Sequence, residues 1–266
     1  MRGRRKPRRR GQGSLTTRPR RRVSCFSWLG FTLCTWLISW EHHHPLIRSE
    51  TTRQYGQVLE ADIGDLAIRR LEEAVRLLRA ATAGRERRGL RHDDADDVTG
   101  TAATDDAIGF NPLPLLRALH EHGAVVAVMG QVAGIMHGSQ ELTGDLDLLW
   151  DGDPGHAPAL AAAFAAAGAS LADPQRRSLP CEPSALGGAK VLFRSALASG
   201  DCCTPALPWG DLAVAAFLTR CRVATAEDGL VIRYLDCTDL IRMRRAVGRP
   251  KDLRRASELE SLAAAG

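Results

Sequence analysis

Hydrophobic side chains recur at helical spacing in the part of the chain that precedes residue 85. They stand three to five positions apart, with arginines and glutamates between them. Such spacing places apolar groups on one face of an α-helix. The pattern predicts an amphipathic helix within residues 51–84, with Gly84 as its stop. The apolar positions are Leu59, Ile63, Leu66, Leu71, Val75 and Leu78.

Beyond residue 110, short apolar runs alternate with further helical patterns. Ala124–Met129 and Leu146–Trp150 are short and continuously apolar, which is typical of buried strands. We predict additional strands at 190–195, around 202, at 220–225 and at 230–235, and helices at 112–122, 131–137, 158–167, 238–247 and from 249 onward. Glu227-Asp228-Gly229 predicts a hairpin between the last two strands. The alternation predicts an α/β (α+β) domain over residues 110–266, with a small mixed sheet covered by helices.

Two segments lack these patterns. Residues 85–109 are charged and aperiodic, so we expect a linker. Residues 1–50 combine a basic block with an apolar run at 23–40 that contains three of the five tryptophans. We expect this extension to be disordered or to lie upstream of the true translation start. A membrane anchor is the alternative, although five Ser and Thr residues weaken an 18-residue run that is at the lower limit for a span.

The charge of the chain is unevenly distributed. The formal net charge is +5, but residues 1–22 hold eleven of the 36 Lys and Arg and no acid. The remainder carries 25 basic and 31 acidic residues. A basic protein suggests nucleic acid or an anionic membrane as a partner. Here that signal belongs to the extension alone, so the pattern gives no strong indication of DNA binding.

The seven cysteines form no C-x-x-C pair. Their scatter, and the adjacent Cys202 and Cys203, suit neither a zinc site nor the disulfide framework of a small secreted chain. We therefore expect reduced thiols and a cytoplasmic protein.

Two aspartates stand two positions apart at the second apolar run. Residues i and i+2 of a strand face the same side, so Asp145 and Asp147 would aim two carboxylates at one point. Leu146 and Leu148 would point the other way. Buried carboxylates are costly unless a cation compensates them, and hard oxygen donors are the ligands of Mg²⁺. The pair predicts a Mg²⁺ site that grips nucleotide phosphates, although an isolated D-x-D is also common on surface strands.

Three further elements would complete a site for phosphoryl chemistry. Gly130, between a strand and a short helix, is the candidate phosphate turn. Asp201 is the candidate third carboxylate, as a ligand of a second metal or as a base, and a loop position is the alternative. Ser139 and Thr143 are candidates for phosphate contacts, or for capping and turn formation alone.

Residues 110–266 resemble small nucleotidyltransferases of the polymerase-beta-like superfamily, in the branch of minimal nucleotidyltransferases and AbiEii-type toxin–antitoxin enzymes. The resemblance rests on Gly130-Gln131, thirteen residues, and Asp145-Leu-Asp147-Leu. The segment from Leu235 to Asp252 is similar to the closing helices of that family. The resemblance implies Mg²⁺-dependent transfer of a nucleotide from an NTP to RNA, including tRNA, to protein or to a small molecule. It also implies a toxin or antitoxin protein as a partner.

Three positions depart from the family's pattern. Gln131 replaces the second Gly or Ser of the turn, where its side chain either crowds the phosphates or offers them an amide. Asp201 is followed by Cys202-Cys203, so its strand keeps one acid. Arg244 stands where the family has Lys. These departures keep an alternative open, in which a catalytically weak or inactive protein of this fold acts as a binding partner.

Overall fold

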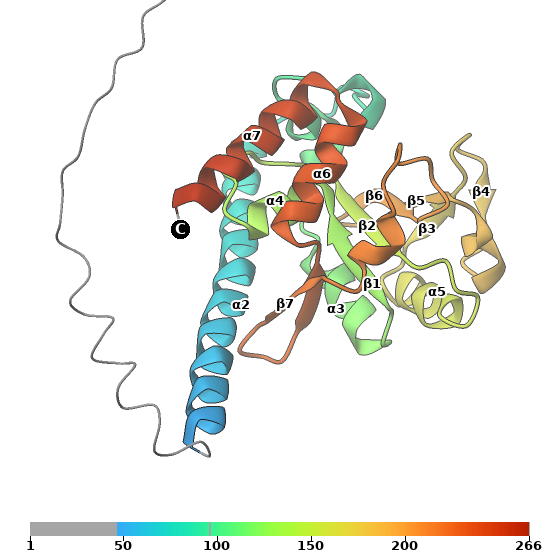
Figure 1. Ribbon diagram of the computed structural model, residues 1–266. Coiled ribbons are helices and arrows are strands. Elements are labelled where there is room, and N and C mark those ends of the chain that lie inside the picture. Colours follow the sequence, from blue (N-terminus) through green and yellow to red (C-terminus); the bar gives the residue numbers. More distant parts are fainter. Residues whose placement is uncertain (1–46, 96, 266) are drawn as a thin grey trace, which may run out of the picture. The chain divides into compact units, whose positions relative to one another are not determined.

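The computed structural model describes residues 47–95 and 97–265, with side chains from residue 65 onward except that of residue 93. The basic block and the apolar run of the extension lie outside these residues. Residues 53–266 form one compact unit, which therefore includes the helix before residue 84 and the segment 85–109 (Figure 1). None of the helices in the described part of the chain combines the length and apolar content needed to cross a membrane.

A single mixed sheet is the centre of this unit. Its strand order is β4-β3-β5-β6-β2-β1-β8-β7. β1 pairs with β8, and β2 with β6, in parallel, while the other neighbours are antiparallel. The strands are β1 Val126–Met129, β2 Leu146–Trp150, β3 Ser170–Ala172, β4 Ser178–Leu179, β5 Lys190–Arg194, β6 Ser199–Cys203, β7 Arg222–Thr225 and β8 Val231–Tyr234.

The mixed α/β class is confirmed, but the expectation of a small sheet is wrong, because the sheet has eight strands. The sequence patterns missed β3 and β4. These strands have three and two residues, which is too short for an alternation to show. They form a hairpin that extends the sheet beyond β5.

Six α-helices surround the sheet within the described residues. They are α2 Ile47–Thr82, α3 Leu113–Glu121, α4 Gly130–Met136, α5 Ala157–Ala166, α6 Cys237–Val247 and α7 Pro250–Ala265. The helix starts and stops follow the expected chemistry. The Asp236 carboxylate accepts a hydrogen bond of 2.9 Å from the Thr238 amide at the start of α6. Gly248 ends that helix with a φ of 72°, the left-handed geometry of a C-terminal glycine.

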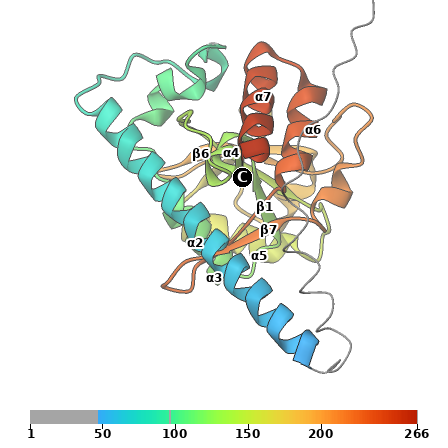
Figure 2. The same cartoon turned by 60° about the vertical axis from the view of Figure 1, so that its left-hand side comes forward.

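The two faces of the sheet have different roles. Leu146 and Leu148 of β2 are fully buried, and the Phe193 ring of β5, two strands away, lies 5.2 Å from the Phe164 ring of α5. Helices α3 and α5 therefore cover the apolar face, while α6 and α7 lie on the other side (Figures 1 and 2). Asp145 and Asp147 line a pocket together with residues of α6 and α7. A buried stripe of α2 joins the same core. Its members are Ala67, Ile68, Leu71, Val75 and Leu78.

Residues 85–107 fold back onto the domain in short turns. They include three 3₁₀ helices, η1 His92–Asp94, η2 Gly100–Ala103 and η3 Asp105–Ala107. The Arg85 guanidinium donates to the carbonyls of Ala102, at 2.9 Å, and of Thr104. Thr101 and Thr104 are buried. These contacts fix the segment beside the end of β2, where it contributes to the candidate site.

Candidate active site

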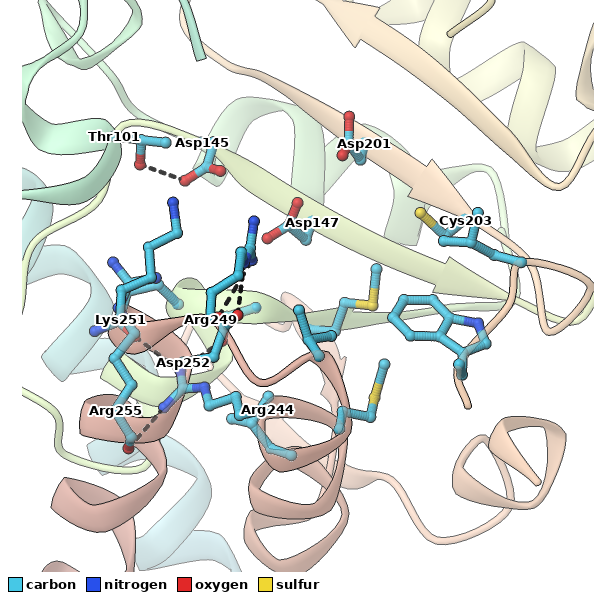
Figure 3. A pocket seen from close by; sticks show the side chains of 18 of the residues that line it. Thr101, Asp145, Asp147, Asp201, Cys203, Arg244, Arg249, Lys251, Asp252 and Arg255 are labelled. Carbon is cyan, nitrogen blue, oxygen red and sulfur yellow. Dashed lines mark hydrogen bonds and ion pairs between the residues drawn. The ribbon is translucent and has the colours of Figure 1, made fainter. Parts of the chain in front are cut away.

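A pocket of about 250 Å³ opens between the polar face of the sheet and helices α6 and α7 (Figure 3). Its wall includes Asp145 and Asp147 at β2, Asp201 of β6, and Gly130 and Gln131 at the start of α4. Five of the seven residues expected from the sequence thus line one cavity. The other two, Ser139 and Thr143, are buried behind its wall.

Asp145 is held by three side chains, two of them from the segment 85–107. Its Oδ1 accepts hydrogen bonds from Thr101, at 2.6 Å, and from Thr143. His92 Nδ1 lies 3.3 Å from Oδ2. Burial alone would raise the pKa of this carboxyl, but the hydrogen bonds and the His92 charge outweigh burial and lower its pKa to about 2. Asp145 is therefore anionic at neutral pH.

The environment of Asp147 shifts its pKa in the opposite direction from that of Asp145. It makes no hydrogen bond or ion pair with any described residue. Burial, followed by the charges of Asp145 and Asp201, raises its pKa to about 8. A cation bound at this position would stabilise the ionised carboxylate.

The position of the Asp147 side chain requires a glycine at residue 130. Its φ is 64°, a conformation that residues with a Cβ rarely adopt. A Cβ built there would lie 2.9 Å from the Asp147 Cγ and closer still to Oδ2. Met129, directly before it, pairs with Asp147 across β1 and β2. The glycine therefore lets the turn after β1 pass against the carboxylate.

Asp201 is brought beside Asp147 by the parallel register of β2 and β6, in which the two residues are Cα partners. Gly200 allows the close approach, since a Cβ there would lie 2.7 Å from the Leu146 carbonyl carbon. The Asp201 carboxylate forms an ion pair with Lys190 of β5. Three carboxylates thus line one pocket, and two of them are paired with the basic side chains His92 and Lys190.

The opposite wall of the pocket is basic. Arg249 and Lys251, at the start of α7, extend toward the carboxylates (Figure 3). Arg249 is bound to Asp252, at 2.6 Å. Lys251 is only 7% exposed, yet its ammonium forms no hydrogen bond or ion pair within residues 65–265. An ammonium that forms no ion pair and lines a pocket is suited to an anionic ligand.

Gln131 and Ser139 form part of a buried network behind the pocket. The Gln131 amide nitrogen donates to Ser139 Oγ, at 2.9 Å, and to the Glu141 carbonyl, at 2.7 Å. Its oxygen accepts from Arg244 at 2.8 Å. Ser139 in turn donates to Glu258, at 2.8 Å. Both polar ends of the Gln131 side chain are thus occupied by protein partners, and the glutamine joins α4 to α6.

Arg244 connects three helices through this network. It also donates to the Gly130 carbonyl and to the Arg255 carbonyl, each at 3.0 Å. We expect Arg244→Met to lower the free energy of unfolding by about 3 kcal/mol or more, because two buried acceptors and one part-buried acceptor lose their donor. Urea unfolding followed by circular dichroism measures this change.

The adjacent Arg245 supplies the matched control. Its guanidinium pairs with Glu260 at the surface, and its side chain is half exposed. Arg245→Met should cost less than about 1 kcal/mol. Equal losses for the two variants would show that the Arg244 network does not hold the helices together.

A second pocket, of about 200 Å³, lies over β3, β5 and β6. It shares four side chains with the first pocket, so the carboxylates stand where the two cavities meet. The shared residues are His92, Asp145, Lys190 and Asp201. Its remaining wall includes the basic side chains Arg176 and Arg194.

The donor set suits a hard divalent cation. Among the described residues, no three His, Cys, Asp or Glu side chains form a ready-made metal cluster. The three carboxylates nevertheless supply the oxygen ligands that Mg²⁺ prefers. Asp147 forms no ion pair with any described residue, and burial, followed by the negative charges of Asp145 and Asp201, raises its pKa. Asp145 and Asp147 are the side chains that could hold such a cation, with Asp201 lining the same pocket.

The cysteines are free thiols where the structure describes them, as expected.

Neither a scan against protein-family models nor a search of curated proteins found a match to the chain. The geometry of the site and the sequence motifs are therefore the basis for assigning a function.

Proposed function

We propose that the protein is a Mg²⁺-dependent nucleotidyltransferase with a fold of the polymerase-beta-like superfamily. One observation carries the proposal. Three carboxylates from two neighbouring parallel strands face a basic wall that contains the unpartnered Lys251. A nucleoside triphosphate with its metal needs such an arrangement, because carboxylates hold the metal while cationic side chains neutralise the phosphates.

Each side chain has a distinct task. Asp145 and Asp147 would hold Mg²⁺, which would supply positive charge to the triphosphate. Lys251 and Arg249 bind the β- and γ-phosphates from the opposite wall. Thr101, Thr143 and His92 keep Asp145 oriented and anionic. Gly130 leaves the space in which Asp147 keeps its position.

The reaction is an in-line displacement at the α-phosphorus. An acceptor hydroxyl oxygen forms a bond to phosphorus, while the bond from phosphorus to the oxygen that bridges to the β-phosphate breaks. Pyrophosphate leaves with that electron pair. The hydroxyl proton passes to Asp201, which borders both pockets. The products are the nucleotidylated acceptor and pyrophosphate.

The second pocket supports a two-substrate reaction, because it offers a separate space for an acceptor beside Asp145 and Asp201. An RNA 3′ end such as that of tRNA, a protein hydroxyl and a small molecule are the acceptor classes to be compared. A toxin–antitoxin setting, with a protein partner, remains part of this proposal through the sequence resemblance.

The test uses the full chain with α-³²P-labelled NTPs, Mg²⁺ and each acceptor class. We expect label to move to one class and pyrophosphate to be released in equal amount. Asp145→Ala/Asp147→Ala should abolish both signals, and EDTA should do the same. Transfer that persists in the double variant would overturn the proposal.

Lys251 gives a second prediction. Lys251→Met should weaken Mg²⁺-dependent NTP binding by about 10- to 100-fold, because one charge-assisted contact to phosphate is lost. Lys251→Arg, which keeps the charge, should recover part of the affinity. Isothermal titration calorimetry measures the dissociation constants. Unchanged affinity in the methionine variant would remove Lys251 from the phosphate site.

The ion pair between Lys190 and Asp201 favours an alternative function. Lys190 forms an ion pair with Asp201, the carboxylate that accepts the proton in the proposed reaction. A protein that binds NTP and a partner without turnover would show this arrangement. The labelling experiment distinguishes the two, since the alternative predicts NTP binding that depends on Asp145 and Asp147 without release of pyrophosphate.

A further inference from the structure

The candidate pocket changes character along its length. At one end are the carboxylates and the basic wall. Elsewhere its lining is apolar and comes from three separate parts of the fold. These apolar residues are Met129, Leu207, Trp209, Leu240, Met243 and Val247. The proposed reaction assigns no role to them.

Helix α6 presents its part of this lining as one stripe. Leu240, Met243 and Val247 stand at positions i, i+3 and i+7, so they share a face of the helix. Leu240 and Met243 are buried, while Val247 is 46% exposed at the rim. The stripe forms an apolar wall that continues from the buried core to the mouth of the pocket.

Trp209 belongs to the segment that follows β6. Its indole nitrogen donates to the Thr204 carbonyl at 3.3 Å, and its own carbonyl accepts from Leu212. The side chain is half-buried, so part of the ring remains available to the pocket. Trp209 is therefore held in place while one part of its surface is free for contact.

Strand β6 connects the carboxylates with the apolar part of the pocket. Asp201 and Cys203 share one face of the strand, and Thr204, which receives the Trp209 hydrogen bond, comes directly after it. Figure 3 shows Cys203 farther than Asp201 from Thr101 and Asp145. A triphosphate at Asp145, Asp147 and Lys251 would thus have its nucleoside directed along β6 toward Trp209.

We propose that the apolar end of the pocket binds the nucleobase against Trp209, and that it favours purines over pyrimidines without distinguishing adenine from guanine. This inference rests on the proposed function. It follows from the chemistry of the lining. The Trp209 N–H is already bonded, and the Cys203 thiol is a weak donor. Side chains that make no hydrogen bonds to the base edges select by contact area, and purines offer more area for stacking.

The test compares ligands that share phosphates but differ in the base. Isothermal titration calorimetry of the full chain with Mg²⁺ gives the affinities for ATP, GTP, CTP, UTP and inorganic tripolyphosphate. We expect ATP and GTP to bind within about threefold of each other, and both to bind about tenfold more tightly than CTP or UTP. Tripolyphosphate should bind more weakly than any of them.

Substitution of Trp209 separates the base contact from the phosphate contact. Trp209→Ala should weaken ATP and GTP binding about tenfold or more and leave tripolyphosphate binding unchanged, while Trp209→Phe should retain most of the affinity. Circular dichroism confirms that each variant is folded. If the alanine variant does not fold, the phenylalanine variant and the ligand series still test the contact between Trp209 and the base.

Two results would overturn the inference alone: pyrimidine nucleotides that bind as tightly as purines, or tripolyphosphate that binds as tightly as ATP. Each leaves Mg²⁺-dependent phosphate binding intact. If neither tripolyphosphate nor any NTP binds with Mg²⁺, the proposed function fails together with the inference.

Discussion

Replacing Asp147 with Asn is expected to abolish nucleotidyl transfer and, at the same time, to stabilise the metal-free protein. The loss of transfer follows from the loss of a proposed metal ligand, and we expect the rate to fall by about 1,000-fold or more. The gain in stability follows from the electrostatics of the site. Asp147 faces two other carboxylates and has no cationic partner within the described residues.

The sign of the stability effect depends on proton linkage. The pKa of Asp147 is raised to about 8 in the folded protein, above that of an aspartate in the unfolded chain. Between these two pKa values the unfolded chain releases a proton that the folded protein keeps. Stability is therefore lost as pH rises from about 4 to about 8, and it stays low above that range. Asparagine carries no charge and removes this loss.

Thermal unfolding at pH 8.5 measures the effect. In EDTA, Asp147→Asn should raise the Tm by roughly 4 to 8 °C, equivalent to about 2 kcal/mol. Mg²⁺ should raise the Tm of the wild-type protein and leave that of the variant unchanged. Glu227→Gln, in the exposed turn between β7 and β8, is the matched control and should alter neither value. A variant less stable than wild type in EDTA would contradict the electrostatic account.

Gly130→Ala should remove Mg²⁺-dependent nucleotide binding and lower stability by about 3 kcal/mol. Two causes combine. A φ of 64° is strained for alanine, and the added methyl group overlaps the Asp147 carboxylate. The carboxylate has to move, so the metal ligands no longer converge. Urea unfolding and calorimetry with MgATP measure the two losses.

Gly168 separates these causes. It has a φ of 61°, and no atom lies within 4 Å of a Cβ built there. Gly168→Ala therefore introduces the backbone strain alone. It should cost about 1 kcal/mol and leave nucleotide binding unchanged. If both alanine variants lose the same stability and both bind nucleotide, the contact between Gly130 and Asp147 has no functional role.

The sequence predicted most of the helices and strands that are long or that have a strong hydrophobic pattern. β2 was predicted with its observed limits, and the hairpin of β7 and β8 was indicated by its turn residues. Helices α6 and α7 were predicted close to their observed limits. The edge hairpin of β3 and β4 was missed because so few residues form it.

The sequence predicted which site residues lie together only where those residues are close in the chain. Asp145 and Asp147 could be paired by strand periodicity. The roles of His92 and Thr101 depend on a long-range contact, because the segment 85–107 has no apolar period that would show where it packs. Lys190 becomes part of the site through the register of β5 with β6. The buried state of Lys251 depends on how α7 lies against the sheet.

Calorimetric titration of the full chain with ATP, in Mg²⁺ and in EDTA, tests the central claim most directly. The carboxylate site predicts binding that requires Mg²⁺ and that disappears in Asp145→Ala/Asp147→Ala while the variant remains folded. Binding of equal strength in EDTA, or in the double variant, or no binding by the wild-type protein, would contradict a metal-dependent nucleotide site at these carboxylates.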